Sequence, residues 1–538
     1  MAVLSVISIP ALLVSLAVAF VLLRLVDAAA RLGCKPAVWG FGGDWAGLSL
    51  MRKGLKAQRE KNVPIWIRQE FARLSAREGR QVGTFQMSAP LFRNVLFTCE
   101  PENIKTILAT SFKDFSLGEN RIGNFKPLLG DGIFASDGKK WEHSRAMLRP
   151  QFVRSQVSDI SLEETHVQNL MTVLDGNLDK GTGWSAAVDL QPLFFRLTLD
   201  SATEFLFGES VNSQLRREGD ATTSAAAFAT SFDASQNQLA VAGRYGNNYW
   251  IGHTKEFHND VRVCHEFIDY FVQKAINRQR NESEKAEDNE RYVFLEAIAK
   301  ETSDPVELRS QLINILLAGR DTTASTLGWF FYTMGQAKNR HIYKRLRGVI
   351  VDEFGTYRNP KPITFEGLKN LSYLQWCVNE TLRLFPIVPM NGRSAVKDTV
   401  LPLGGGADGC SPILVKKGQD IGYSVSIAQG SPSLSQILTP AQVHVMHHRT
   451  DLWGADADEF RPERWEKRRP GWDYLPFNGG PRICIGQQFA LTEITYVVVR
   501  MLQRFDDLDG STLPAESHGL GLTNCPGEGV PLKLHFAE

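Results

Sequence analysis

The chain lacks several features that define common protein classes. It has no Cys-x-x-Cys pair, and its seven cysteines are scattered along 538 residues, which argues against a disulfide framework and suits a reducing compartment. Its 60 basic and 59 acidic side chains balance, so the composition provides no general attraction to nucleic acid, and we expect no such partner. We find no internal repeat and no Ser/Gly/Pro-rich linker that divides the chain.

Charge is also absent from the first 23 residues, which include the strongly apolar run from Ile7 to Leu23. That run approaches the roughly 20 residues that a membrane-spanning helix needs. Lys and Arg follow the run but none precedes it, and this bias places the rest of the chain in the cytosol. A cleaved signal peptide is the alternative, because Ala28-Ala29-Ala30 offers small residues. The uncharged start and the long apolar stretch favour an uncleaved anchor.

The most informative segment is Phe477 to Gly486, which reads F-x-x-G-x-R-x-C-x-G. The next run has the pattern of a helix, so a thiolate at Cys484 would lie near a helix N-terminus, where negative charge is favoured. Glycines let backbone amides approach the sulfur, where their hydrogen bonds would tune a metal–thiolate centre. Arg482 could pair with an anionic group on the cofactor that carries such a metal. A buried structural cysteine is the alternative. The five specified positions of this ten-residue pattern, all present here, argue against that alternative.

This loop resembles the haem-ligand loop of the cytochrome P450 monooxygenases, in which a cysteine thiolate is the axial ligand of the haem iron. The resemblance implies that Cys484 is the metal ligand. It also implies that Phe477 and Arg482 belong to the haem-binding site.

A second motif lies in the apolar run from Leu308 to Met334, which is long enough for a central helix. The segment Asp304-Pro305-Val306-Glu307 predicts its start, with Asp at the N-cap, Pro at the first helical position and Glu at the third. The run contains A-G-R-D-T-T at residues 318–323. Glycine costs about 1 kcal/mol against alanine in a helix, and hydroxyls can bond preceding carbonyls and bend it. A kinked core helix is therefore the alternative to a functional motif.

The motif is similar to the A-G-x-D-T-T signature of the P450 family's long distal helix. The resemblance implies that Ala318 and Gly319 open space for O2 over the iron. It further implies that Thr322 donates a hydrogen bond to iron-bound dioxygen and that Asp321 belongs to the proton-delivery route. Haem-thiolate isomerases that rearrange peroxides without O2 are an alternative of another class, and they tend to lack this acid–threonine pair.

Other motifs of the family follow in its usual order. Trp141 and Arg145 match W-x-x-x-R, and the resemblance places them, with Arg393 and Arg482, on the haem propionates. The E-x-x-R pair lies on one helix face, and the family adds an arginine from the F-R-P-E-R-W loop to it. Three structural residues are therefore expected to form a buried ion cluster: Glu380, Arg383 and Arg464.

The resemblance covers nearly the whole chain and implies a mainly α fold: a large helical domain with a small β-rich region, plus a transmembrane anchor helix. We expect an anchor over residues 1–24, a membrane-proximal linker over 25–60 and the catalytic domain over 61–538. Strands are expected near Gly83–Thr98, Gly392–Val400 and Pro412–Ile421, and in the tail through Leu534. Gly404 to Gly406 is expected to turn a hairpin rather than to bind phosphate, since no Gly-Lys-Ser/Thr follows.

Within the family, the chain looks most like the microsomal fungal alkane and fatty-acid hydroxylases. The evidence is the run from Phe477 to Glu493, the segment Glu380 to Pro386 with the following V-P-M-N, and Asp451 to Trp465. This implies insertion of one oxygen atom of O2 at or near the terminal carbon of a long-chain aliphatic substrate. A tailoring hydroxylase acting on an alkyl arm of a fungal secondary metabolite is the alternative. An apolar substrate tunnel is expected to involve Phe228, Phe232 and Leu239.

The implied partners are the lipid bilayer of the endoplasmic reticulum, a small hydrophobic substrate and a separate NADPH-dependent reductase, because the chain has no flavin domain of its own. Two basic runs are candidates for the reductase surface, Lys139-Lys140 and Lys467-Arg468-Arg469. His447 and His448 are weak metal candidates, since no cysteine or acid stands at suitable spacing.

The stretch from Val425 to Gln442 departs from the family pattern. Deleting these 18 residues would join Gly422-Tyr423-Ser424 to Val443-His444-Val445-Met446, as the hydroxylase group leads one to expect. The stretch is rich in Ser, Pro and Gln and lacks strand or helix periodicity, so we expect an irregular surface loop. Val-Ser and Ala-Gln at its ends can be encoded by intron donor and acceptor sequences. Our hypothesis is a retained in-frame intron, and a genuine loop insertion is the alternative.

Overall fold

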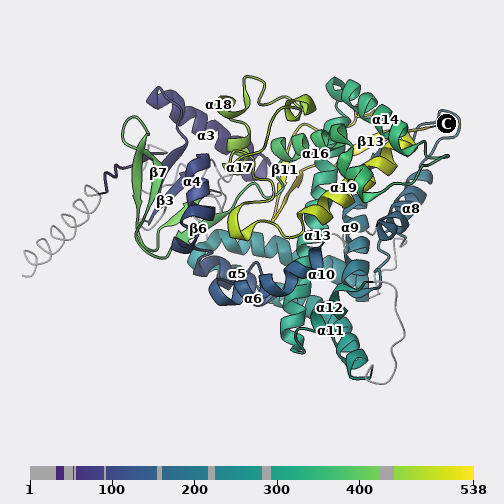
Figure 1. Cartoon of the computed structure of the whole chain (residues 1–538), viewed down its shortest axis with the longest axis horizontal. Coiled ribbons are helices and arrows are strands. Elements are labelled where there is room, and N and C mark those ends of the chain that lie inside the picture. Colours follow the sequence, from purple (N-terminus) through teal and green to yellow (C-terminus); the bar gives the residue numbers. More distant parts are fainter. Residues whose placement is uncertain are drawn as a thin grey trace, which may run out of the picture.

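A 30-residue helix, α13 (Pro305–Met334), runs through the middle of the molecule (Figure 1). It starts as predicted, because the Asp304 carboxylate accepts a hydrogen bond from the Val306 amide (2.9 Å) and Pro305 takes the first position. The computed structural model describes residues 32–40, 53, 56–89, 93–153, 160–215, 224–281, 292–423 and 442–537.

Helices make up most of the fold, as predicted. The longer ones besides α13 are α3 (Val63–Glu78), α5 (Glu119–Leu129), α6 (Gly138–Leu148), α8 (Ser161–Asp175), α9 (Leu190–Phe207), α10 (Ser224–Ala242), α11 (Lys255–Asn281), α14 (Arg340–Phe354), α16 (Ser372–Leu384) and α19 (Gln487–Arg504). The shorter helical segments are α4 (Pro101–Lys105), η1 (Thr106–Thr110), η2 (Phe112–Asp114), η3 (Arg149–Phe152), η4 (Gly243–Gly252), α12 (Phe294–Ala299), η5 (Ala337–Asn339), α15 (Phe365–Asn370), α17 (Gln442–His447), α18 (Thr450–Trp453), η7 (Pro462–Trp465) and η8 (Gly480–Arg482).

The largest sheet lies at one end of the molecule, with its strands in the order β1-β2-β3-β9-β6-β4 (Figure 1). Its members are β1 (Val38–Trp39), β2 (Thr84–Ala89), β3 (Arg93–Thr98), β4 (Phe115–Ser116), β6 (Gly392–Ala395) and β9 (Asp420–Gly422). The smaller sheets contain β5 (Val188–Asp189), β7 (Thr399–Gly405), β8 (Ser411–Val415), β10 (Phe505–Asp509), β11 (His518–Leu520), β12 (Asn524–Pro526) and β13 (Pro531–Phe536).

The four predicted strand regions are confirmed, with one difference. The Gly392–Val400 region contains β6 and the start of β7, which belong to different sheets, because β6 joins the large sheet while β7 forms an antiparallel hairpin with β8. The predicted hairpin turn is confirmed as well. Gly404 and Gly406 both have positive φ, at 109° and 80°, which glycine adopts at low cost.

The core divides along α13. The C-terminal half of this helix packs with α14, α16 and α19, where Trp329 is fully buried. The N-terminal half packs with α9, α10 and α11, and the sheet forms a third cluster with α3. Helix α9 lies along α13, since the Thr198 hydroxyl donates to the Arg320 carbonyl (2.9 Å) and the rings of Phe194 and Phe331 stack at 5.4 Å. Helix α13 therefore links the helical halves of the molecule.

The predicted anchor at residues 1–24 lies outside the described residues, and so does the stretch from Val425 to Ala441. Within the described ranges, no helix combines the length and the apolar character that crossing a bilayer requires. The predicted domain boundaries therefore stay predictions.

Candidate active site

The cysteine loop runs from η8 into α19, and Gly486 is the N-cap residue of that helix. The loop is closed by a hydrogen bond from the Cys484 amide to the Phe477 carbonyl (3.0 Å). Cys484 is exposed, yet it lies deep enough among protein atoms that burial raises the pKa of its thiol. A hydrogen bond from the Gly486 backbone and the charge of Arg145 both act to lower that pKa. The sulfur thus lies at a helix N-terminus, as the sequence predicted.

One glycine of the motif is required by its surroundings. Gly480 has φ 65°, and a Cβ atom there would lie 1.9 Å from the Leu108 carbonyl oxygen. Asn478 also adopts a positive φ, at 63°. The loop therefore packs its backbone directly against η1, which only a residue without a side chain permits.

Helix α6 presents Trp141 and Arg145 to the cysteine loop. The Arg145 Nη1 donates to the Ile483 carbonyl (3.0 Å). The Arg482 guanidinium lies over the Trp141 ring, 4.3 Å from its centroid, and its Nη2 is 2.5 Å from Asp137 Oδ1. The structure thus brings together three of the predicted haem-binding residues around the loop.

Arg393 on β6 joins this group with an arginine that the sequence analysis missed. Arg121 on α5 donates through Nη1 to Asn391 Oδ1 (2.8 Å), and Arg393 Nη1 donates to the same oxygen (3.1 Å). Burial and repulsion from Arg393 lower the pKa of Arg121 to about 10. No sequence signal pointed to Arg121, because it belongs to no motif and meets its partner 270 residues further along the chain.

The charges of this cluster fit an anionic cofactor. Burial lowers the pKa of Arg482 to about 9, with Arg393 and Arg121 adding repulsion and Asp137 acting in the opposite direction. Three guanidinium groups therefore share the field of one nearby carboxylate, and additional negative charge would relieve their repulsion. The two carboxylates of iron protoporphyrin would supply that charge, and the Cys484 thiolate would supply the iron ligand. The residues present therefore fit haem.

The A-G-R-D-T-T segment lies at the centre of α13. The Thr322 hydroxyl donates to the Ala318 carbonyl (2.6 Å), and the Thr326 hydroxyl donates to the Thr322 carbonyl (2.7 Å). These are the backward hydroxyl bonds predicted from the sequence. A Cβ atom on Gly319 would meet only the Ala202 methyl group, at 3.9 Å. Close packing therefore does not require glycine at this position.

Asp321 is buried beside Thr322. Burial raises the pKa of its carboxyl to about 6, although Arg320 lies 3.3 Å away and acts to lower it. A carboxyl with such a pKa can both hold and release a proton near neutral pH.

The predicted ion cluster of Glu380, Arg383 and Arg464 is formed. Arg383 donates to both carboxylate oxygens of Glu380 (2.9 Å each), and Arg464 Nε donates to Oε1 (2.8 Å). Two further donors were not predicted, the Trp465 indole (3.0 Å) and the Arg461 amide (3.0 Å). The cluster links α16 to the loop around η7.

The residues expected to line a substrate tunnel do not lie on an open surface. Phe228, Phe232 and Leu239 are fully buried on α10. The Phe228 ring stacks on that of Phe267 at 4.2 Å, between α10 and α11. The substrate tunnel stays a prediction.

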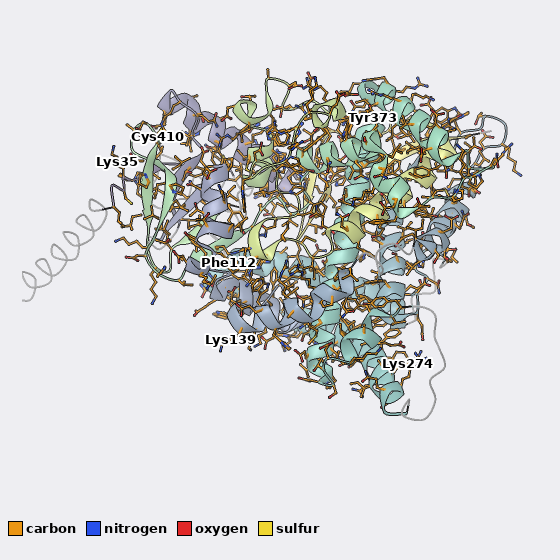
Figure 2. All side chains as sticks on the ribbon, viewed as in Figure 1. Lys35, Phe112, Lys139, Lys274, Tyr373 and Cys410 are labelled. Atoms are coloured by element: carbon orange, nitrogen blue, oxygen red, sulfur yellow. The ribbon has the colours of Figure 1, made fainter. Side chains whose placement is uncertain are left out.

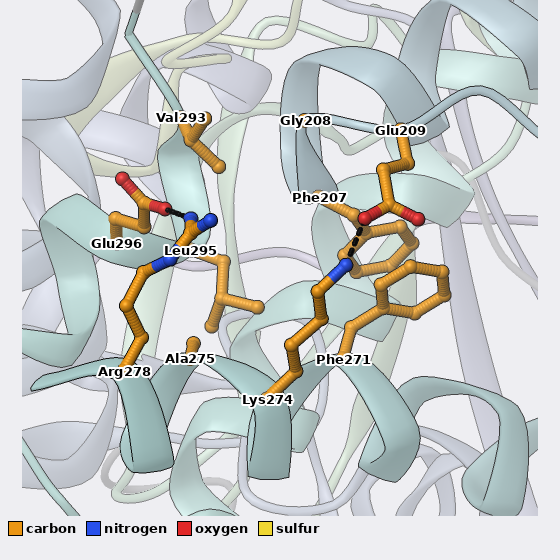
Figure 3. Close-up of a pocket in the computed structure, with 10 residues that line it drawn as sticks. All are labelled: Phe207, Gly208, Glu209, Phe271, Lys274, Ala275, Arg278, Val293, Leu295 and Glu296. Atoms are coloured by element: carbon orange, nitrogen blue, oxygen red, sulfur yellow. Dashed lines mark hydrogen bonds and ion pairs between the residues drawn. The ribbon is translucent and has the colours of Figure 1, made fainter. Parts of the chain in front are cut away.

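A separate pocket of about 260 Å³ opens at the end of α9, beside α11 and α12 (Figure 3). The Phe207 and Phe271 rings stack there at 4.4 Å, and the charged groups above them are paired, Lys274 with Glu209 and Arg278 with Glu296. None of the predicted site residues lines this pocket.

The weak metal candidates have other roles. His447 Nε2 accepts a hydrogen bond from the Leu475 amide (3.0 Å), and His448 pairs with Asp458 (2.6 Å). Among the described residues, no group of three or more His, Cys, Asp or Glu side chains could hold a metal ion.

The mainly helical fold, the cysteine loop at the start of α19 and the arginine cluster define a haem-thiolate protein. The chain belongs to the cytochrome P450 family, whose model, described as Cytochrome P450, matches residues 66–428 and 438–527. The unmatched residues 429–437 fall inside the stretch that departs from the family pattern. The chain is accordingly a cytochrome P450 monooxygenase, with haem as cofactor and electrons supplied by a redox partner.

Relatives over most of the chain are fungal. Cytochrome P450 monooxygenase g430 of a Fusarium species is 49% identical over 493 residues, 90% of this chain and 81% of the relative. Cytochrome P450 monooxygenase alt2 of Alternaria solani is 41% identical over 520 residues, 93% and 91% of the two chains. Cytochrome P450 52A5 of Candida maltosa is 48% identical over 432 residues, 78% and 76% of the two chains.

Proposed function

We propose that this monooxygenase hydroxylates a long-chain aliphatic substrate, an alkane or a fatty acid, at or near its terminal carbon. The observation that carries this proposal is the likeness to the fungal alkane and fatty-acid hydroxylase group in the cysteine loop and around E-x-x-R. The similarity to several P450s of group 52 supports it, including 43% identity over 490 residues to Cytochrome P450 52A12 of Debaryomyces hansenii.

Each group of residues in the site is proposed to have a separate role. When bound, the haem iron would supply O2 activation, and the Cys484 thiolate is proposed to hold it. Trp141, Arg145, Arg393 and Arg482 are proposed to hold the carboxylates of that cofactor, with Arg121 as a further cation. On α13, Asp321 is proposed to hold and pass protons, and the Thr322 hydroxyl is proposed to donate a hydrogen bond to O2 in the site. Glu380, Arg383 and Arg464 are proposed to hold the pocket together without taking part in chemistry.

We further propose that residues 1–24 anchor the enzyme in the endoplasmic reticulum membrane with its catalytic domain in the cytosol. The uncharged apolar start and the Lys and Arg that follow it support this orientation. The first described segment also exposes apolar side chains, since Leu32 is 54% and Trp39 is 49% exposed. Detection of the full-length protein in washed microsomes, with loss from them on removal of residues 1–24, would test the anchor.

The electrons are proposed to come from NADPH through a separate reductase that docks on exposed cations near the cysteine loop. Lys139 at the start of α6 reaches the outer surface of the molecule (Figure 2). Its neighbour Lys140 pairs with Asp131 (2.9 Å). Arg468 lies over the Trp453 ring at 3.7 Å and pairs with Asp473, so it is the least available cation of its run.

Ligation is tested by Cys484→Ser. We expect loss of the thiolate-type Soret band in the carbon-monoxide complex of the reduced protein, together with loss of all oxygenase activity. Cys377→Ser is a matched control, because that cysteine is buried in the core and outside the loop. Retention of both properties in Cys484→Ser would overturn the proposed ligand.

Substrate class is tested with purified enzyme, reductase and NADPH on alkanes and fatty acids, with products identified by mass spectrometry. Terminal alcohols are the expected products. Oxidation at internal positions only, or none on either class, would refute the proposal.

Oxygen activation is tested by Thr322→Ala, which should still bind haem but divert electrons from NADPH to hydrogen peroxide. Asp321→Asn should slow proton delivery, because an amide cannot pass a proton as a carboxyl does. Unchanged product per NADPH in both variants would show that the roles of these residues are wrong.

A tailoring hydroxylase of a fungal secondary metabolite is the second candidate. It is favoured by the 49% identity to the Fusarium monooxygenase g430, whose name does not place it in group 52. Biosynthetic genes next to this one would favour the second candidate, and genes of lipid oxidation would favour the first.

A further inference from the structure

The arginine inside the distal motif is bound more closely to another helix than to its neighbouring aspartate. Arg320 is almost completely buried, with 6% of its side chain exposed. Its Nη1 and Nη2 donate to the two carboxylate oxygens of Asp233 on α10, the second at 3.1 Å. Its contact with Asp321 is a single one, at 3.3 Å from Nη1. A two-bond guanidinium–carboxylate pair is the stronger arrangement, so Asp233 is the main partner of Arg320.

The surroundings hold the guanidinium in this place. The Arg320 guanidinium carbon lies 5.2 Å from the centroid of the Phe195 ring and 5.9 Å from that of the Phe232 ring. Its Nε is buried and has no hydrogen-bond partner among the described residues. The side chain therefore lies between rings of α9 and α10, with its two Nη atoms available to carboxylates.

Two side chains of helix α10 act on Arg320 and Asp321. Asp233 binds Arg320, and Gln236, three residues further on the same helix face, acts on Asp321 by lowering the pKa of its carboxyl. Asp321 is otherwise approached by Cys525 from β12, a thiol whose pKa burial raises to about 12 and which is therefore neutral. Within the described part of the chain, the charges that act on Asp321 are those of Arg320 and Asp233.

These two charges act on Asp321 in opposite directions. Arg320 lowers the pKa of the Asp321 carboxyl, whereas Asp233 raises it, in addition to the increase caused by burial. Loss of Asp233 would remove a like charge and would also leave Arg320 with Asp321 as its remaining carboxylate partner. Both changes favour the ionised form of Asp321.

We propose that Asp233 is a positioning residue, which holds Arg320 off Asp321 while α10 is seated on α13 and so leaves the Asp321 carboxyl free to pass protons. Proton delivery then depends on the position of α10. A movement of α10 away from α13 would release Arg320 to Asp321 and close the route. The inference rests on the proposed function, since it assigns Asp321 to proton delivery.

The first test measures product and hydrogen peroxide per NADPH as a function of pH in Asp233→Asn, with the full-length haem-loaded enzyme. Because the Asp233 side chain is 52% exposed to water, we expect the midpoint of the profile to move to lower pH by about half a unit, roughly a threefold change in the ratio of protonated to ionised Asp321. Peroxide should rise at pH 7.5. Asp233→Glu should restore most of the wild-type profile, and Asp352→Asn, on the exposed surface of α14, is the charge-matched control.

The second test does not use activity. Hydrogen exchange of α10 amides in the ferric, haem-loaded protein should be faster in Asp233→Asn than in wild type, and unchanged in Asp352→Asn. Thermal midpoints of Asp233→Asn, Arg320→Gln and the double variant should be non-additive, with the double variant no less stable than Arg320→Gln, because the neutral glutamine already removes the ion pair. The exchange measurement stands even where Arg320→Gln fails to fold.

An unchanged pH profile together with unchanged exchange on α10 would overturn the inference, and so would fully additive thermal midpoints. A wild-type enzyme that forms peroxide but oxidises no aliphatic substrate would refute the substrate class instead. The peroxide profile of Asp233→Asn would still report on the role of Asp233 in that case.

Discussion

Replacement of Glu380 by glutamine should destabilise this protein more than most single substitutions. The carboxylate is fully buried and accepts five hydrogen bonds. The amide of glutamine keeps the shape of the side chain but removes its charge, and its NH2 group would face donors. The buried Arg383 guanidinium would then lack its counter-charge, and Arg464 would keep Asp456, whose carboxylate oxygen lies 3.4 Å from its Nη2.

The expected cost is about 3–5 kcal/mol, the range for breaking a buried pair by removing one partner. The cost is large because the remaining bonds of Arg383 go to backbone carbonyls, including those of His447 and Ala457 (2.7 Å each), which carry no net charge. Since native proteins have only about 5–15 kcal/mol in total, we expect poor haem loading as well as a lower unfolding midpoint.

Glu463→Gln is the matched control. Glu463 lies in the loop that carries Arg464. Its carboxylate pairs with Arg345 at 2.7 Å, but its side chain is 40% exposed. A pair in contact with water contributes about 0–1 kcal/mol. Urea unfolding followed by tryptophan fluorescence, and haem content after purification, would compare the two variants. Equal losses in both would refute the argument that burial makes the Glu380 cluster essential.

Charge reversal at Lys139 and Arg469 should raise the reductase concentration needed for half-maximal rate, more at low salt than at high salt. Charge reversal at Arg468 should instead lower the stability of the fold. If reversal at Lys139 and Arg469 has no effect at low salt, these residues do not belong to the reductase interface. The buried His444, whose pKa burial and the neighbouring histidines hold well below its ordinary value, is neutral in the fold, so stability should be fully present above the unfolded pKa of about 6.5 and fall as pH drops below it. His444→Phe should reduce that loss between pH 7 and 5.5, and an unchanged slope would exclude this residue as its source. Sequencing of the mature transcript should show a dominant message without Val425 to Gln442; a fully haem-loaded protein that carries the segment would end the intron hypothesis.

The local parts of the site could be predicted from the sequence because they depend on neighbouring residues. The N-cap at Asp304 and the cysteine beside the start of α19 are set by residues within one turn of each other. The backward hydroxyl bond of Thr322 is equally local, since it spans four residues. Family motifs extended this to Glu380 and Arg464, which are 84 residues apart, since their residue types and order indicated a buried ion cluster.

Only the tertiary structure decided which unpatterned residues join the site. Arg121 and Asp233 stand in no motif, and each reaches its place through the packing of a whole helix against distant chain segments. The same packing places Phe228 in the core between α10 and α11, against Phe267. The residue types in the local motifs, through the family resemblance that they carry, indicated which chemistry the chain has. The meeting of charges from α5, β6 and η8, and from α10 and α13, depended on long-range packing, which the order of residues along the chain does not specify.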